Sequence, residues 1–192
     1  MNYGLPRAVD IDGEQFAIRY DFRAILDIFE ALNDPKLDEG DRASVMLQIF
    51  YVEPERITNF SNAITECIRF INGGKLESQK ENSKAPKLVD WKKDFQYIVG
   101  PINRILGYEI REKEYDPFNN TGGVHWYTFL SAYSEIGDCL FSQIVRIRNK
   151  KAKGRPLDKS DAEFYRKNRD LVDFDINYTD ADNEVLERWG AG

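Results

Sequence analysis

Residues 90–107 read DWKKDFQYIVGPINRILG, and this stretch decides the fold class. Its apolar residues keep to one helical face, while Asp90 is placed to cap the start and Gly107 to end the helix. Pro101 predicts a kink or a split into two helices. The expected inward positions are Trp91, Phe95, Ile98, Val99, Ile102, Ile105 and Leu106.

Other segments repeat this helical spacing on both sides of residues 90–107. The residues predicted to cap helices there are Asp21, Asp41, Thr58 and Ser160. Two more helices are expected from Trp126 and from Leu140. The inward positions expected before residue 75 are Phe22, Ile25, Leu26, Phe29, Leu32, Val45, Met46, Ile49, Phe50, Phe60, Ala63, Ile64, Cys67, Ile68 and Ile71.

The N-terminal region predicts a β-hairpin. Two short alternating runs, residues 8–11 and 14–18, flank Asp12-Gly13, and an Asp-Gly pair suits a type I′ turn. The fold class is therefore mainly α, a compact multi-helix domain with an N-terminal β-hairpin. Residues 1–74 form its first half, 75–89 a polar linker or loop, 90–172 a helical second half, and 173–192 an acidic tail.

Composition excludes several classes of protein. The chain has 192 residues, of which 42% are hydrophobic and 31% charged, as in globular domains. No apolar run is long enough to cross a membrane, and the start lacks a secretion signal. Cys67 and Cys139 provide neither a disulfide framework nor the spacing of a zinc site.

The sequence holds no recognisable catalytic or cofactor motif, so we expect no enzyme, no metal and no cofactor. His125 is the one histidine, and its expected role is packing or hydrogen bonding at a helix start. Gly73-Gly74-Lys75 lacks the other residues of a phosphate-binding loop and instead predicts a helix end.

Charge is unevenly distributed along a chain with a net charge of −6. Residues 146–159 are strongly basic, and an acidic tail follows them. Such a pair of segments can attract a polyanion or pair with itself, or it can simply be solvated. Nucleic-acid binding is not favoured, because no aromatic residues are interleaved with the basic ones.

Three clusters, in order, resemble the bacteriophage gene-product-fifteen family over roughly residues 5–170. They include Asp21-Phe22-Arg23 with Leu32-x-Asp34-Pro35, then Phe50-Tyr51 with Gly73-Gly74, then Asp90-Trp91 with His125-Trp126-Tyr127-x-Phe129 and Ile144-x-x-x-Arg148. Tyr127 departs from the family, which usually has a second tryptophan there.

The resemblance implies a small accessory protein encoded in a phage tail module ahead of the tape-measure protein. It implies a tail assembly chaperone in the cytoplasm of the bacterial host, with the tape-measure protein as partner and a second chaperone or the tail-tube protein as further candidates. Self-association also stays open. The alternatives are a structural tail or virion-morphogenesis protein and a nucleic-acid-binding regulator that uses residues 146–159.

Two sets of residues are candidates for binding a partner. The first is the aromatic stretch, in which His125 and Tyr127 are expected on the surface and Trp126 in the core, with Phe129 beside it. The second is the basic segment. The candidates are His125, Trp126, Tyr127, Tyr133, Arg146, Arg148, Lys150 and Lys151.

Overall fold

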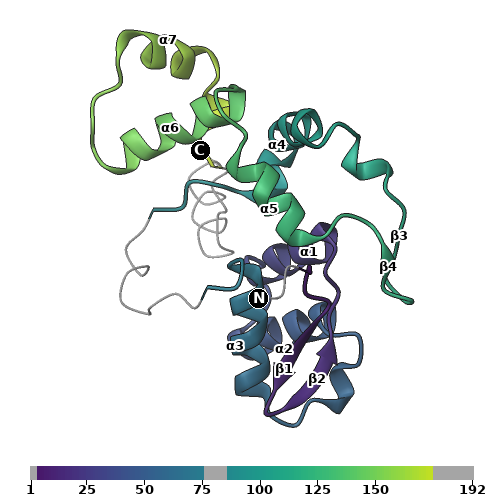
Figure 1. The fold of residues 1–192 in the computed structure, drawn as a ribbon. Helices are drawn as coiled ribbons and strands as arrows, with labels where there is room; N and C mark the ends of the chain where they lie inside the picture. The colour runs from purple at the N-terminus through teal and green to yellow at the C-terminus, as the bar shows by residue number, and fades with distance from the viewer. Residues whose placement is uncertain (1–3, 76–85, 175–192) are drawn as a thin grey trace, which may run out of the picture. The chain divides into compact units, whose positions relative to one another are not determined.

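The computed structural model describes residues 4–75 and 86–174, and within them it confirms a mainly α fold with an N-terminal hairpin (Figure 1). Most of the predicted linker and acidic tail lies outside these residues. The helices are α1 (Phe22–Leu32), α2 (Glu39–Phe50), α3 (Phe60–Ile71), α4 (Trp91–Leu106), α5 (Trp126–Ser134), α6 (Leu140–Ala152), α7 (Lys159–Lys167) and α8 (Arg169–Val172). The strands are β1 (Ala8–Ile11), β2 (Glu14–Ala17), β3 (Tyr115–Asp116) and β4 (Thr121–Gly122), and short 3-10 helices span Pro54–Arg56 and Ile110–Glu112.

The chain divides into two compact units, residues 1–142 and residues 143–192. The division falls inside α6. The first unit holds the hairpin and helices α1 to α5, whereas the described part of the second holds the rest of α6 with α7 and α8. Among the described residues, no helix combines the length and apolar character that crossing a bilayer requires.

The N-terminal hairpin forms around the predicted Asp12-Gly13 turn. Val9 pairs with Phe16, and both turn residues have positive φ, 54° at Asp12 and 89° at Gly13. The amide of Gly13 donates to Oδ1 of Asp10 at 2.9 Å, which fixes the turn. The hairpin packs against α3, and this contact covers the apolar side that a lone hairpin would expose.

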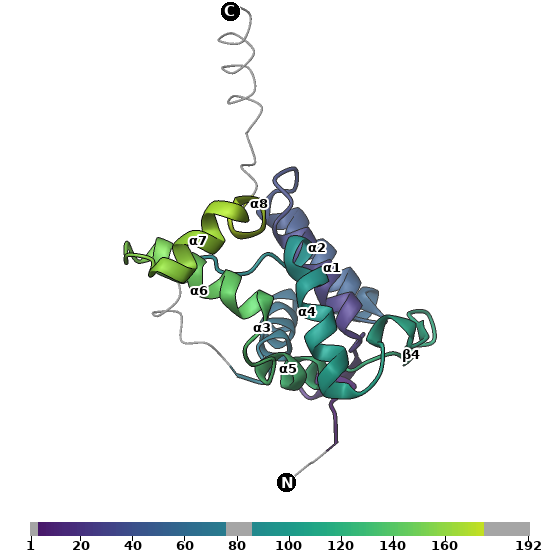
Figure 2. The same ribbon diagram turned by 90° about the horizontal axis from the view of Figure 1, so that it is seen from above.

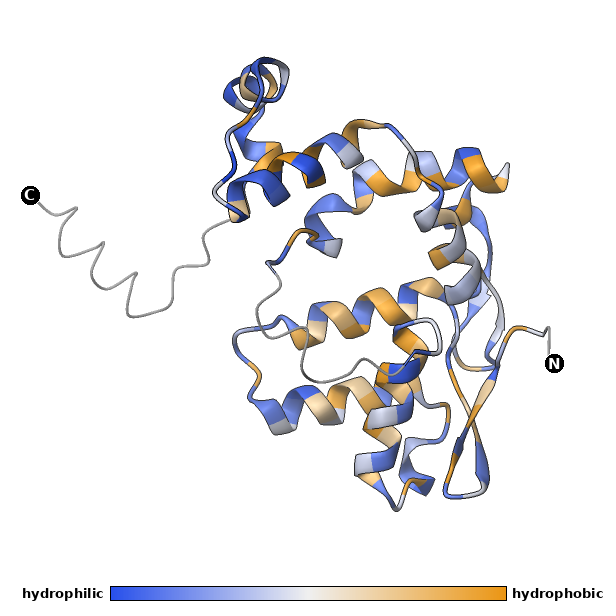
Figure 3. Ribbon diagram, turned by 60° about the vertical axis from the view of Figure 1, so that its left-hand side comes forward, coloured by the Kyte–Doolittle hydropathy of each residue, from blue (hydrophilic) through white to orange (hydrophobic). Residues whose placement is uncertain are grey.

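Helix α1 packs against both α2 and α4 in the first unit (Figure 2). Asp21 caps it as predicted, by accepting from the amide of Arg23. Phe22 and Ile25 are buried as expected, Ile28 is buried as well, and Leu26 is half-buried. Orange and blue stretches alternate along the helices in Figure 3, which is the amphipathic pattern that such packing requires.

Three of the predicted helix caps are wrong, each by three residues or fewer. Asp38 caps α2 rather than Asp41, Asn59 caps α3 rather than Thr58, and Asp158 caps α7 rather than Ser160. A cap must reach an amide two or three residues ahead of it, and in α2 the amide that donates belongs to Asp41 itself, at 2.8 Å.

Helix α4 continues through Pro101, so of the two predicted outcomes, a kink or a split, the split is wrong. Ile98, Val99 and Ile102 are buried on both sides of the proline, and this packing holds one continuous helix. At its start, Asp90 accepts from the amide of Lys93 while the buried Asp94 accepts from the amide of Asp90 at 2.8 Å. The two carboxylates satisfy two amides of the first turn reciprocally.

Candidate partner-binding surfaces

The aromatic stretch at the start of α5 forms the centre of the first unit. Trp126 is buried, as expected, and its Nε1 donates to the carbonyl of Ile71 at 2.8 Å. The ring of Phe129 stacks on those of Phe22 and Trp126, each at 5.2 Å between centroids. These rings join α1, α3 and α5, so they stabilise the fold rather than face a partner.

His125 is buried, so its expected surface position is wrong, whereas its expected role at the helix start is confirmed. Nδ1 caps α5 by accepting from the amide of Tyr127 at 3.0 Å, which leaves the proton on Nε2 to be donated to the carbonyl of Pro6 at 2.8 Å. The ring stacks on Tyr20. Burial lowers the pKa of His125, because the charged imidazolium would be poorly solvated there.

Tyr127 and Tyr133 are half-buried. Tyr127 stacks on Phe70 with centroids 4.9 Å apart, and Tyr133 contacts Trp91 at 5.3 Å. Burial raises the pKa of both phenols, that of Tyr133 to about 12. Only part of each ring is available to a partner.

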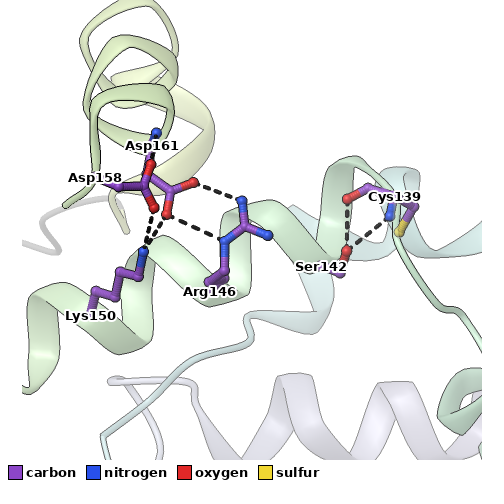
Figure 4. Close-up of polar contacts among 6 residues, drawn as sticks. All are labelled: Cys139, Ser142, Arg146, Lys150, Asp158 and Asp161. Atoms are coloured by element: carbon purple, nitrogen blue, oxygen red, sulfur yellow. Dashed lines mark hydrogen bonds and ion pairs between the residues drawn. The ribbon is translucent and has the colours of Figure 1, made fainter.

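In the second unit, Arg146 and Lys150 converge on one buried carboxylate, that of Asp161 (Figure 4). Arg146 Nη2 and Lys150 Nζ each lie 2.7 Å from its oxygens, and Lys150 also pairs with Asp158 at 2.9 Å. These hydrogen bonds and ion pairs hold the pKa of Asp161 well below its usual range. Two of the predicted partner-binding cations therefore join α6 to α7.

Arg148 and Lys151 are also engaged within the second unit. Arg148 is buried, donates from Nε to the carbonyl of Val172 at 2.6 Å, and lies over the ring of Phe174. This burial leaves Arg148 little surface for binding a partner. Lys151 pairs with Asp173, so the basic segment does pair with the first residue of the acidic tail.

A better candidate surface lies on the outer side of α3. Phe60 is 60% exposed and Ile68 is 43% exposed, with the half-buried Ile64 between them. The spacing of four places the three residues along one ridge, which we call the α3 ridge. Residues 57–65 contain no charged side chain.

The inward positions expected for Phe60 and Ile68 are therefore wrong. The predicted stripe on α3 was wider than the face that the hairpin and α2 cover, and Ala63, Cys67 and Phe70 take the inner positions. Burial raises the pKa of the Cys67 thiol, so the reactive thiolate is disfavoured there. The sequence did carry a signal for this exposed ridge, because α3 has more apolar residues than its covered face can bury.

A second surface is a groove of about 730 Å³ in the first unit, which the sequence did not indicate. One wall is residues 110–118, which we call the strap. Two arginines hold the strap in place: Arg19 donates to the carbonyl of Pro117 at 3.1 Å, and Arg23 donates to that of Lys113 at 2.7 Å. Arg19 also donates to three carbonyls at the end of α2, those of Gln48, Ile49 and Tyr51.

The far end of the strap presents an aromatic ring to solvent. Asp116 accepts from the amides of Phe118 and Asn119, at 2.9 and 3.1 Å, and these bonds fix the β3–β4 turn. Phe118 is 89% exposed and lines the groove. An exposed ring on a fixed turn offers apolar area that a partner could cover.

The described residues contain no group of three or more histidine, cysteine or acidic side chains able to hold a metal ion. A family model described as "Bacteriophage Gp15 protein" matches residues 1–174 of the chain. No curated protein and no solved structure gives a significant match.

Proposed function

Because this chain belongs to the bacteriophage Gp15 protein family, we propose that it is a tail assembly chaperone. The family itself points to a structural or morphogenesis protein of a phage. In our proposal the chain binds the tape-measure protein in the cytoplasm of the bacterial host while the tail is built. This role needs neither a catalytic residue nor a cofactor.

The observation that supports this proposal is the α3 ridge. A tape-measure protein is a long helical chain with apolar stripes, and those stripes are prone to aggregate before the tail tube encloses them. A ridge of apolar residues four apart packs well into the groove of another helix. Phe60 and Ile68 together offer such a ridge, and the chain around Phe60, residues 57–65, carries no charged side chain of its own.

The size of the α3 ridge also suits a chaperone that must later be displaced. Three side chains on one helix give a small contact, and small contacts are weak and transient. Many copies bound along one tape-measure chain would still keep it covered. The tail-tube protein would then replace them one after another.

The test is co-expression with the tape-measure protein encoded beside this one, with the solubility of the tape-measure chain as the readout. The variant is the double substitution Phe60→Ser and Ile68→Ser. The matched control is Leu140→Ser, because Leu140 is also 43% exposed but lies on α6. We expect a soluble complex with the unchanged protein and with the control, and aggregated tape-measure chain with the double variant.

Other outcomes would contradict the chaperone role or the α3 ridge as its site. A protein that forms no complex but stays in purified tails would be a structural component of the virion. A protein that does neither, but binds DNA in a salt-dependent way, would be a regulator. A soluble complex that survives the double substitution would leave the chaperone role intact and exclude the α3 ridge as its site.

A further inference from the structure

The described part of the second unit carries an excess of positive charge. Residues 143–174 contain ten lysine or arginine residues and five acidic ones. Lys153, Arg155 and Lys159 are exposed, and none of them forms an ion pair with a residue that the structure describes. We call these three residues the loop cations, because they lie in the loop between α6 and α7 or at the first residue of α7.

Backbone hydrogen bonds fold the loop onto the last turn of α6. The amide of Gly154 donates to the carbonyl of Lys151 at 3.0 Å, and the amide of Arg155 donates to that of Lys150 at 2.8 Å. The positive φ of Gly154, 61°, permits this reversal of the chain. The backbone at Lys153 and Arg155 is therefore held close to that of Lys151.

The acidic tail begins beside the same turn of α6. The carboxylate of Asp173 pairs with Lys151 and accepts from the hydroxyl of Tyr165 at 2.8 Å. The guanidinium of Arg148 lies over the ring of Phe174, 4.2 Å from its centroid. The chain that continues from Phe174 therefore starts against the C-terminal half of α6, near the loop cations.

The segment that follows has the opposite charge. Residues 175–192 lie outside the described residues, and they contain five acidic residues and one arginine. A single surface ion pair is weak, but a short tether raises the effective concentration of a segment to the millimolar range, so that several weak pairs can form together. Charge complementarity and the tether at Asp173 favour this segment over a free acidic peptide as the occupant of the loop cations.

We propose that residues 175–192 bind the loop cations and shield them from other polyanions. The contact is electrostatic, so it weakens as the salt concentration rises and the screening length falls from about 10 Å at 0.1 M to about 3 Å at 1 M. A polyanion must displace the tail before it can reach the loop. The proposal concerns the second unit alone and does not depend on the tape-measure assignment.

The first test compares the ¹⁵N-labelled full chain with a neutral-tail variant. This variant carries the substitutions Asp175→Asn, Asp180→Asn, Asp182→Asn, Glu184→Gln and Glu187→Gln. At about 50 mM salt, its amide signals should differ from those of the unchanged chain across residues 152–159 but not in α1, and the differences should fade at about 500 mM salt. Identical signals across residues 152–159 at low salt would overturn the proposal.

The second test measures how accessible the loop cations are to a fluorescent oligoglutamate peptide. At low salt, the neutral-tail variant should bind this peptide about fivefold more tightly than the unchanged chain, or better. Adding Lys153→Gln with Arg155→Gln to the variant should abolish the gain, whereas adding Lys36→Gln with Lys75→Gln should not. Lys36 and Lys75 are exposed in the first unit, so this control removes the same charge elsewhere. No gain in the neutral-tail variant, or an equal loss with both pairs, would show that the tail does not shield the loop.

Discussion

Asp21 and His125 pair as an antiparallel bridge, and each of them caps the helix that follows it. The amide of Phe22 donates to the carbonyl of Val124 at 3.0 Å, and the amide of Trp126 donates to that of Tyr20 at 2.7 Å. Asp21 also accepts from the amide of Val124 at 2.6 Å. Helices α1 and α5 therefore begin from one shared junction.

The first prediction concerns Gly123, which lies in this junction. A Cβ on Gly123 would lie 2.0 Å from Oδ2 of Asp21, at a φ of +74°. We expect Gly123→Ala to lower the free energy of unfolding by about 3 kcal/mol or more. Gly107→Ala is the control, because Gly107 has a similar φ of +77° and nothing within 4 Å of the added atom. Gly107→Ala should lower the free energy of unfolding, measured in urea, by only about 1 kcal/mol. If the two variants lost the same free energy, a steric role for Asp21 would be refuted.

The second prediction concerns pH and His125. Since burial lowers the pKa of His125 in the folded state, the unfolded chain binds the proton more readily. The stability that neutral His125 contributes is therefore fully present above the unfolded pKa of about 6.5. This contribution is lost as the pH falls below that value. His125→Asn keeps an acceptor for the amide of Tyr127 and does not titrate, although its shorter side chain loses the donor to Pro6 and so lowers stability at every pH. Urea unfolding at several pH values should show that the unchanged protein loses more stability on acidification than the variant; parallel curves would contradict this.

The third prediction concerns the buried carboxylate of Asp161. The pKa of Asp161 is lower in the folded than in the unfolded protein. The stability that the ionised carboxylate contributes is therefore fully present above the ordinary aspartate pKa, and it is lost as the pH falls from there towards the folded pKa. At neutral pH, Asp161→Asn should destabilise the packing of α7 on α6 by about 1–3 kcal/mol. Glu163→Gln is the control, because its pair with Lys167 is exposed and should contribute less than about 0.5 kcal/mol. Amide hydrogen exchange in α7 distinguishes the two, and similar exchange rates would show that the Asp161 pairs add no stability.

The fourth prediction concerns how Arg19 holds the strap. Lysine keeps the charge but cannot span the carbonyls of Pro117 and Tyr51 together as the guanidinium does. Arg19→Lys should speed hydrogen exchange across the β3–β4 turn about tenfold or more, because a loss of roughly 1.4 kcal/mol corresponds to that factor. Exchange in α7 should stay unchanged. Slow exchange in the turn of the variant would mean that Arg23 alone secures the strap.

The helices and the hairpin were predictable because their signals are local. The period of apolar residues places α1 and α4, and Asp12-Gly13 places the turn. The caps were harder to predict, because several Asp, Asn, Ser or Thr residues lie at or near the starts of α2, α3 and α7 and only the backbone geometry selects one. Pro101 does not split α4, because buried residues on both sides of it pack as one helix.

The surfaces were harder to predict than the fold. The carbonyls that accept from Arg19 come from distant parts of the chain, so no spacing of residues in the sequence predicts the groove. The burial of Arg148 depends on carbonyls at the end of α8, which composition cannot reveal. Phe60 is exposed because the hairpin and α2 cover only part of α3. How much of a helix is covered depends on the folded unit and cannot be read from the sequence of the helix alone.

The shared junction of α1 and α5 also sets the order in which the protein can form during synthesis. When the ribosome has made only the hairpin and α1 to α3, the rings of Phe22 and Phe70 and the carbonyl of Ile71 still lack their partners in α5. The nascent chain must wait for Trp126 before this part of the core closes, and contacts so distant in sequence form slowly. Premature termination before α5 would therefore release a fragment with uncovered aromatic faces, prone to aggregation and proteolysis.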